Sequence, residues 1–174
     1  TLRDRRAALI ARIGDGPYKA LFSIVSALGL ALIIYGFALY RATGWIDVWY
    51  PPRWTRHVTD LLMWPAVIMI LAAYVPGHIK HTLKHPMLAG VKLWAFAHLI
   101  ANGDLGSIIL FGSILAWAVY DRIAVKRREP QGAAVSPSPV SWRNDIVAVV
   151  VGTLVYLALG FVFHPVVIGV PAFG

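Results

Sequence analysis

Long apolar segments constrain this chain more than any other feature of its sequence. They fall at about residues 18–40, 57–75, 86–101, 105–125 and 146–163. About 20 apolar residues in a helix cross the roughly 30 Å of hydrocarbon in a bilayer. The first, second and fifth segments meet that length, whereas the third is short and needs interfacial ends or longer neighbours to span. The pattern predicts a polytopic transmembrane helix bundle with about five spans.

The composition favours the same class of protein. The chain is 59% hydrophobic and 14% charged, whereas a soluble domain has about half apolar and about a quarter charged residues. The apolar runs lack the alternating pattern of an outer-membrane barrel, so we expect an all-α fold. Cysteine is absent, which excludes thiolate catalysis and cysteine ligation of a metal or haem.

Basic residues between the apolar runs predict the topology. Of the 16 lysine and arginine residues, 12 lie in the N-terminal tail, the second loop and the fourth loop of a five-span arrangement. The positive-inside rule places these regions in the cytoplasm of a bacterial inner membrane. The corner at residues 102–104 then faces outward. We therefore explain the net charge of +8 by topology and not by nucleic-acid binding, and expect membrane lipid as the first partner.

Four regions follow from this pattern. We expect residues 1–17 to form a basic amphipathic segment on anionic lipid, and residues 18–125 to form a four-span core. Residues 126–143 are rich in proline, serine and alanine and predict a cytoplasmic linker, and residues 144–174 hold the last span and a tail. Glycines such as Gly29, Gly36 and Gly90 lie within the apolar runs, where small residues allow helices to pack closely.

The stretch KHPMLAGVKLWAFAHLIANGDLGS, residues 84–107, combines an apolar helix with ionisable groups. Gly90, Trp94, His98 and Asn102 are spaced four apart and share one helix face. Such a stripe could line a pocket for a flat apolar cofactor such as haem, with His98 as axial ligand. The alternative is that His98 only forms a hydrogen bond with a neighbouring helix.

Other ionisable groups have two interpretations each. Lys92 either extends toward the cytoplasmic headgroups or pairs with a carboxylate. The segment HIKHTLKH places His78, His81 and His85 near one helix face, which could hold a transition metal. Because two lysines and no acidic residue accompany them, a basic cytoplasmic loop is the alternative.

The carboxylates form no obvious buried pair in the sequence, so acid–base hydrolysis has no support. Asp104 is expected to cap the helix that starts at Leu105. His164 precedes Pro165 at the end of the last apolar run, and we expect it at the membrane interface.

Residues 84–128, KHPMLAGVKLWAFAHLIANGDLGSIILFGSILAWAVYDRIAVKRR, resemble the NnrU family of bacterial membrane proteins. Residues 54–77, WTRHVTDLLMWPAVIMILAAYVPG, and residues 15–33, DGPYKALFSIVSALGLALI, fit the same pattern. The resemblance covers about residues 2–128 and implies a link to nitrite and nitric oxide reduction. The similar zeta-carotene isomerase is a membrane protein that holds haem b through histidines and isomerises a polyene.

This resemblance implies haem b as cofactor and His98 as an axial ligand, with His85 as a motif residue. Trp94 and Asn102 complete the expected cofactor site. The sequence departs from the family pattern in two ways. An N-terminal helix that would supply the second histidine ligand is expected to be missing, and residues 94–97 hold no cysteine where the isomerase has one.

The alternative function is a non-enzymatic accessory or assembly subunit of a larger respiratory or photosynthetic membrane complex. A third, weaker hypothesis is a transporter in which Lys92 and His98 relay a proton without an acidic partner.

Overall fold

The structure, a computed structural model, describes residues 2–128 and 140–173 of the chain. The described residues form helices joined by loops, with one isolated antiparallel bridge between Asp47 and Asp104. The elements are α1 (Leu2–Ile13), α2 (Asp15–Thr43), α3 (Trp54–Ala72), α4 (His78–Leu83), α5 (Pro86–Ala101), α6 (Leu105–Lys126), α7 (Trp142–Ala158) and the π-helix η1 (Leu159–Ile168). The predicted all-α fold is confirmed. The chain divides into two units, Thr1–Trp45 and Ile46–Gly174.

The first unit contains α1 and α2. Gly14, with a φ of 87°, separates the two helices in a backbone conformation that favours glycine. The Arg6 guanidinium lies 5.3 Å from the centre of the Tyr18 ring, and Asp15 pairs with Lys19 at 2.6 Å. No residue of α2 is buried, and the helix is long and apolar enough to cross a membrane.

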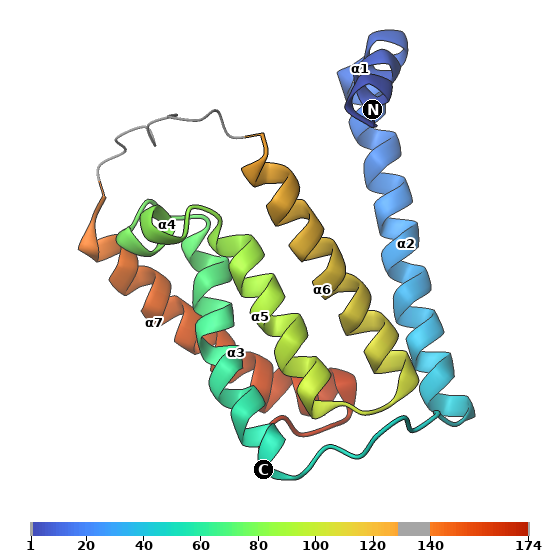
Figure 1. The fold of residues 1–174 in the computed structure, drawn as a ribbon, viewed down its shortest axis with the longest axis vertical. Helices are drawn as coiled ribbons and strands as arrows, with labels where there is room; N and C mark the ends of the chain where they lie inside the picture. Colours follow the sequence, from blue (N-terminus) through green and yellow to red (C-terminus); the bar gives the residue numbers. More distant parts are fainter. Residues whose placement is uncertain (1, 129–139, 174) are drawn as a thin grey trace. The chain divides into compact units, whose positions relative to one another are not determined.

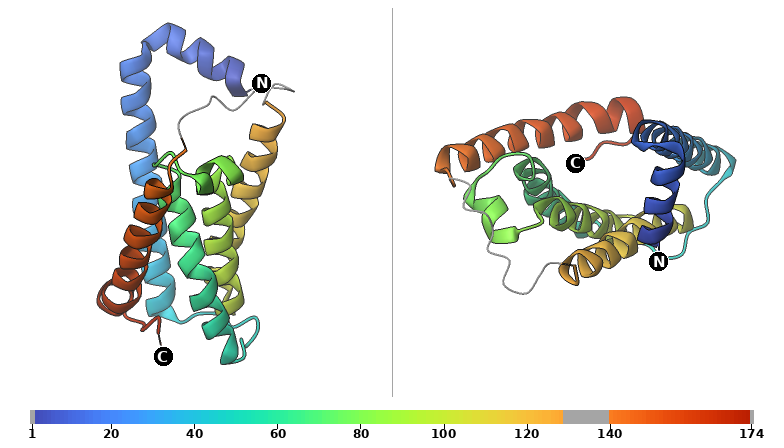
Figure 2. Two further views of the ribbon diagram at one scale, coloured as in Figure 1. Left: turned by 90° about the vertical axis from the view of Figure 1, so that its left-hand side faces the viewer. Right: turned by 90° about the horizontal axis from the view of Figure 1, so that it is seen from above.

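The second unit is a bundle around α3 and α5. Contacts link α3 to α5 and to α7, and α5 to α6, so the helices follow one another in the order α7, α3, α5, α6 (Figures 1 and 2). The core is made of small and branched side chains and one phenylalanine: Ala66, Val67, Ile68, Ala72, Leu88, Ala95, Ala97, Phe111, Ala118 and Ala148. Most of them lie on α3 and α5, which are the inner helices.

Glycines set the closest helix contacts. A Cβ atom on Gly90 of α5 would lie 2.7 Å from the Ala66 carbonyl oxygen of α3, and one on Gly152 of α7 would lie 2.8 Å from Ile68 Cγ1. The prediction that Gly90 allows close packing is confirmed. Gly29 and Gly36 of α2 have open space where a Cβ would stand.

The corner at residues 102–104 is held by the loop that precedes α3. Val48 and Trp49 donate their backbone N–H groups to the Gly103 carbonyl at 2.9 and 3.1 Å, and Leu105 donates to the Ile46 carbonyl at 2.9 Å. Asp104 Oδ1 accepts a hydrogen bond from the Ser107 backbone N–H at 2.9 Å. The predicted helix cap is confirmed, and the corner is anchored more firmly than a solvent-exposed turn.

Among the described residues, three helices are long and apolar enough to cross a membrane: α2, α6 and α7 together with η1 (Trp142–Ile168). This supports a membrane protein. The other two predicted spans, which correspond to α3 and α5, do not meet these criteria. At 16 residues, α5 is about 24 Å long, and the first turns of α3 carry Arg56, His57 and Asp60. The short length of α5 and the polar first turns of α3 keep both from being identified as spans by length and composition alone. Both are inner helices of the bundle.

The ends of the last predicted regions also shift. Residues 129–139 of the predicted linker lie outside the described residues, α6 ends at Lys126 and α7 begins at Trp142. The final apolar run continues beyond residue 163 as a π-helix that includes Pro165. Gly169, with a φ of 76°, then turns the chain so that residues 170–173 form a short tail.

Candidate functional site

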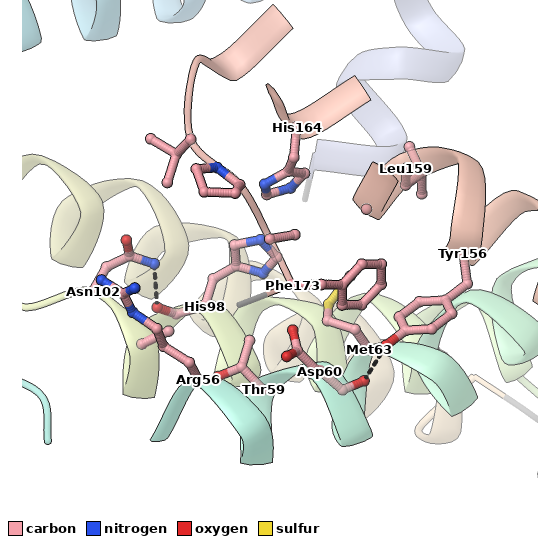
Figure 3. A pocket seen from close by; sticks show the side chains of 15 residues that line it. Arg56, Thr59, Asp60, Met63, His98, Asn102, Tyr156, Leu159, His164 and Phe173 are labelled. Atoms are coloured by element: carbon pink, nitrogen blue, oxygen red, sulfur yellow. Dashed lines mark hydrogen bonds between the residues drawn. The ribbon is translucent and has the colours of Figure 1, made fainter. Parts of the chain in front are cut away.

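A cavity of about 160 Å³ lies between α3, α5, α7, η1 and the tail (Figure 3). It collects polar and aromatic side chains from segments that are far apart in the sequence. Its lining residues are Arg56, Thr59, Asp60, Met63, His98, Ala101, Asn102, Tyr156, Leu159, Gly160, His164, Val170, Pro171, Ala172 and Phe173. All of them belong to the second unit.

His98 is held in one orientation within this cavity. Its Nδ1 lies 2.9 Å from the Trp94 carbonyl oxygen, and because a carbonyl only accepts, Nδ1 carries the proton and donates. The ring stacks on Phe111 with centroids 4.5 Å apart and contacts the Trp94 ring at 5.0 Å. In the neutral imidazole, Nε2 is then left with a free lone pair.

His164 brings a second imidazole to the same cavity. Its ring centroid lies 6.2 Å from that of His98, with 39° between the ring planes. Its side chain is half-buried on η1, which follows α7 without a break. The expectation that His164 sits at the membrane interface stays a prediction, and the structure places His164 in the same cavity as His98. The π-helical geometry changes which side of the segment each residue occupies, so helical spacing alone did not indicate this pairing.

Polar groups of α3 form the floor of the cavity. The Tyr156 hydroxyl donates to the Asp60 carbonyl oxygen at 3.0 Å, and Thr59 donates to the Ala97 carbonyl oxygen at 2.9 Å. The Asp60 carboxylate lines the same cavity as His164. The sequence showed no acidic partner for Lys92 and His98 in the spans, and in the structure Asp60 lines the cavity together with His98. Only the tertiary fold places Asp60 and His164 in the same cavity.

Of the four residues predicted to share one face of α5, two line the cavity and two do not. His98 and Asn102 line the cavity, and the Asn102 side-chain amide donates to the His98 carbonyl oxygen at 2.7 Å. Trp94 lies behind His98, with its ring 5.2 Å from Phe111. Gly90 packs against α3. His85 precedes the first turn of α5, about 20 Å along the helix from His98, and is outside the cavity.

The histidine-rich segment at α4 has a structural partner that the sequence analysis missed. The Asp145 carboxylate of α7 accepts hydrogen bonds from the backbone N–H groups of His78 and Ile79 at 2.9 and 3.0 Å. It also lies 2.7 Å from His78 Nδ1, and the His78 ring stacks on Trp142 at 4.1 Å. An acidic residue, Asp145, therefore accompanies these histidines in the fold. Its buried carboxylate joins α4 to α7.

No group of three or more histidine, cysteine, aspartate or glutamate residues with metal-binding geometry occurs in the described part of the chain. This finding argues against a metal held by His78, His81 and His85 together. Lys92 is half-buried on α5, and its extension toward the cytoplasmic headgroups stays a prediction.

The fold and the cavity define a helical membrane protein with a two-histidine site inside its bundle. The family model described as NnrU protein matches residues 1–172, so the chain belongs to the NnrU family. The match extends the resemblance beyond residue 128 to α7, η1 and the tail, which supply His164. No curated protein matches the chain, and no solved structure matches it.

Proposed function

We propose that this NnrU-family chain binds haem b in the cavity between α5 and η1, with His98 and His164 as the axial ligands. The observation that carries the proposal is the hydrogen bond from His98 Nδ1 to the Trp94 carbonyl, with a second imidazole 6.2 Å away. Histidines that bind metals usually donate their other ring N–H to a carbonyl or carboxylate, which fixes the tautomer and the ring direction.

The spacing of the two rings supports a shared metal. A metal–imidazole bond is about 2.0–2.1 Å long, and the atoms of a five-membered ring with bonds of about 1.35 Å lie about 1.15 Å from its centre. Two imidazoles on opposite sides of one metal ion therefore have centroids about 6.3 Å apart. The distance between the His98 and His164 rings is 6.2 Å.

The number of ligands favours haem over a bare ion. A structural zinc site usually has four protein ligands and a catalytic one three, and no such group occurs in the described part of the chain. Two imidazoles are sufficient for haem iron because the porphyrin supplies the remaining nitrogens. Apolar side chains such as Met63 and Leu159 line the cavity beside the two histidines and give surroundings that suit a flat macrocycle.

The size of the cavity sets a condition on this proposal. Cofactor pockets usually have volumes of about 300–1,000 Å³, and this cavity measures about 160 Å³. It accommodates the metal and the adjacent part of a macrocycle. The remainder requires space that the tail, residues 170–173, fills now. Phe173 is central because its ring packs against Tyr156 and Phe161 at 5.3 and 4.7 Å.

Bound haem would supply a redox-active iron, which suits either a role in nitrite and nitric oxide reduction or polyene cis–trans isomerase-type chemistry. His98 and His164 would hold the haem iron, Phe111 packs behind His98, and the Asp60 carboxylate lines the same cavity. We further propose a bacterial inner-membrane location with cytoplasmic basic loops. In that topology the cavity lies near the outward end of the bundle, because it contains Asn102.

An absorption spectrum tests the proposal. The full chain is expressed with haem supplied, purified in detergent and examined for the six-coordinate, low-spin spectrum that two imidazoles produce. We expect His98→Ala and His164→Ala each to lose that spectrum. His85→Ala is the matched control, because His85 lies on the same helix as His98 but outside the cavity, and it should keep the spectrum.

Two results would count against the proposal. Haem-free wild-type protein would overturn haem binding, and stoichiometric co-purification with another membrane protein would then support an accessory role. A normal spectrum in His164→Ala together with a lost one in His85→Ala would overturn the site between α5 and η1, because His85 is too far from His98 to bind the same iron.

A further inference from the structure

Beyond the ligand pair, the cavity has a polar side and an apolar side. Arg56 and Asn102 lie on one side of the two histidines, and Leu159, Tyr156 and Phe173 lie on the other (Figure 3). The polar side lies near the helix ends, because Arg56 is in the first turn of α3 and Asn102 directly follows α5. A flat ligand with one charged edge would therefore enter in only one orientation.

Arg56 is the cation at this polar side. Its side chain is exposed yet lines the cavity, and among the residues that the structure describes its guanidinium has no hydrogen-bond or ion-pair partner. Asp60, one turn further along α3, does not pair with it. The Asn102 amide N–H is already used by the His98 carbonyl. Arg56 is thus the strong donor that remains available to an anionic group at the rim.

We infer that Arg56 binds a carboxylate of the ligand that occupies this cavity, namely a propionate of haem b. The inference rests on the proposed haem binding and deepens it. The fork of N–H groups on a guanidinium matches the two oxygens of a carboxylate. Burying an unpaired carboxylate is costly, so the propionate edge belongs at the exposed side and the apolar edge near Leu159, in the space that Phe173 fills now.

A titration that varies both partners tests this. Ferric haem b and its dimethyl ester, which lacks the carboxylate charges, are each titrated into detergent-solubilised full chain, and Kd is measured by absorption. We expect Arg56→Gln to weaken binding of haem b roughly fivefold, the equivalent of about 1 kcal/mol for a solvent-accessible ion pair. The dimethyl ester should bind wild type and Arg56→Gln equally.

Arg53→Gln is the matched control, because Arg53 is also exposed, precedes the same helix and does not line the cavity. It should bind haem b like the wild type. An unchanged Kd for haem b in Arg56→Gln, with a normal low-spin spectrum, overturns the inference and leaves the proposed function intact. Equal weakening of haem b and the ester would also overturn it, since that loss would not depend on the carboxylate. A wild type that binds neither ligand overturns the proposed function and this inference together.

Discussion

Replacing Asp145 is expected to loosen the junction between α7 and α4. The carboxylate is buried, with 7% of the residue exposed, and it accepts from two backbone N–H groups and contacts the His78 ring. In Asp145→Ala the N–H groups of His78 and Ile79 lose their acceptor. This junction is the contact between the start of α7 and α4.

The magnitude follows from the number and exposure of these bonds. A hydrogen bond to a charged group contributes about 1.5–3 kcal/mol net, but the three bonds are not additive and 39% of the His78 side chain is exposed to solvent. We therefore expect Asp145→Ala to lower the free energy of unfolding by about 2–4 kcal/mol. For a chain of this length that corresponds to a fall in Tm of roughly 4–16 °C. Asp145→Asn keeps one acceptor oxygen and should lose about half as much.

Thermal unfolding in detergent, followed by circular dichroism, measures the effect. Asp15→Asn is the control, because Asp15 pairs with a single lysine at the surface and such pairs contribute at most about 1 kcal/mol. If Asp145→Ala unfolds within 2 °C of Asp15→Asn, the carboxylate does not hold the two helices together and the reasoning fails.

Three further substitutions test the packing, the cavity and the cap. Gly90→Val should destabilise the bundle by about 1–3 kcal/mol, because its Cβ would lie 2.7 Å from the Ala66 carbonyl oxygen. Gly112→Val is the control, because the space around Gly112 is open. Equal losses of stability for the two variants in detergent unfolding would contradict the contact. Phe173→Ala should accelerate haem association several-fold in stopped-flow absorption, since the ring occupies the space that the macrocycle needs; an unchanged rate would contradict the movement of the tail. Asp104→Ala should cost about 1 kcal/mol, seen as a lower Tm, and an unchanged Tm would show that the cap contributes nothing.

Local signals account for the parts of the fold that the sequence predicted well. Pro86 suits the first turn of a helix, Asn102 and Gly103 interrupt the helix pattern, and Asp104 caps the next helix. The predicted segments 86–101 and 105–125 accordingly match α5 and α6 closely. The end of the last helix was predicted less well. Pro165 suggested a stop, but the chain continues as a π-helix to residue 168, a geometry that has no clear signature in hydrophobic periodicity.

The candidate site was predicted only where its residues are neighbours in the sequence. His98 and Asn102 follow from one helix face. Asp60 and His164 are separated by more than one hundred residues, and they line one cavity because α3 packs against α7, which continues into η1. Asp145 was missed for the same reason, since its partners are backbone N–H groups of a distant short helix. Long-range contacts of this kind have no counterpart in local spacing.

Because the two imidazoles come from α5 and η1, ligand binding should also stabilise the fold. A ligand that binds only the folded state adds about 2.7 kcal/mol at a concentration one hundred times its Kd, equivalent to a rise in Tm of roughly 5–11 °C. We expect ferric haem to raise the Tm of the wild type and of His85→Ala by this amount, and to leave that of His164→Ala nearly unchanged. This readout is independent of the absorption spectrum. Haem that alters the spectrum without raising the Tm would bind outside the cavity, because a ligand bridging α5 and η1 must be released before the two separate.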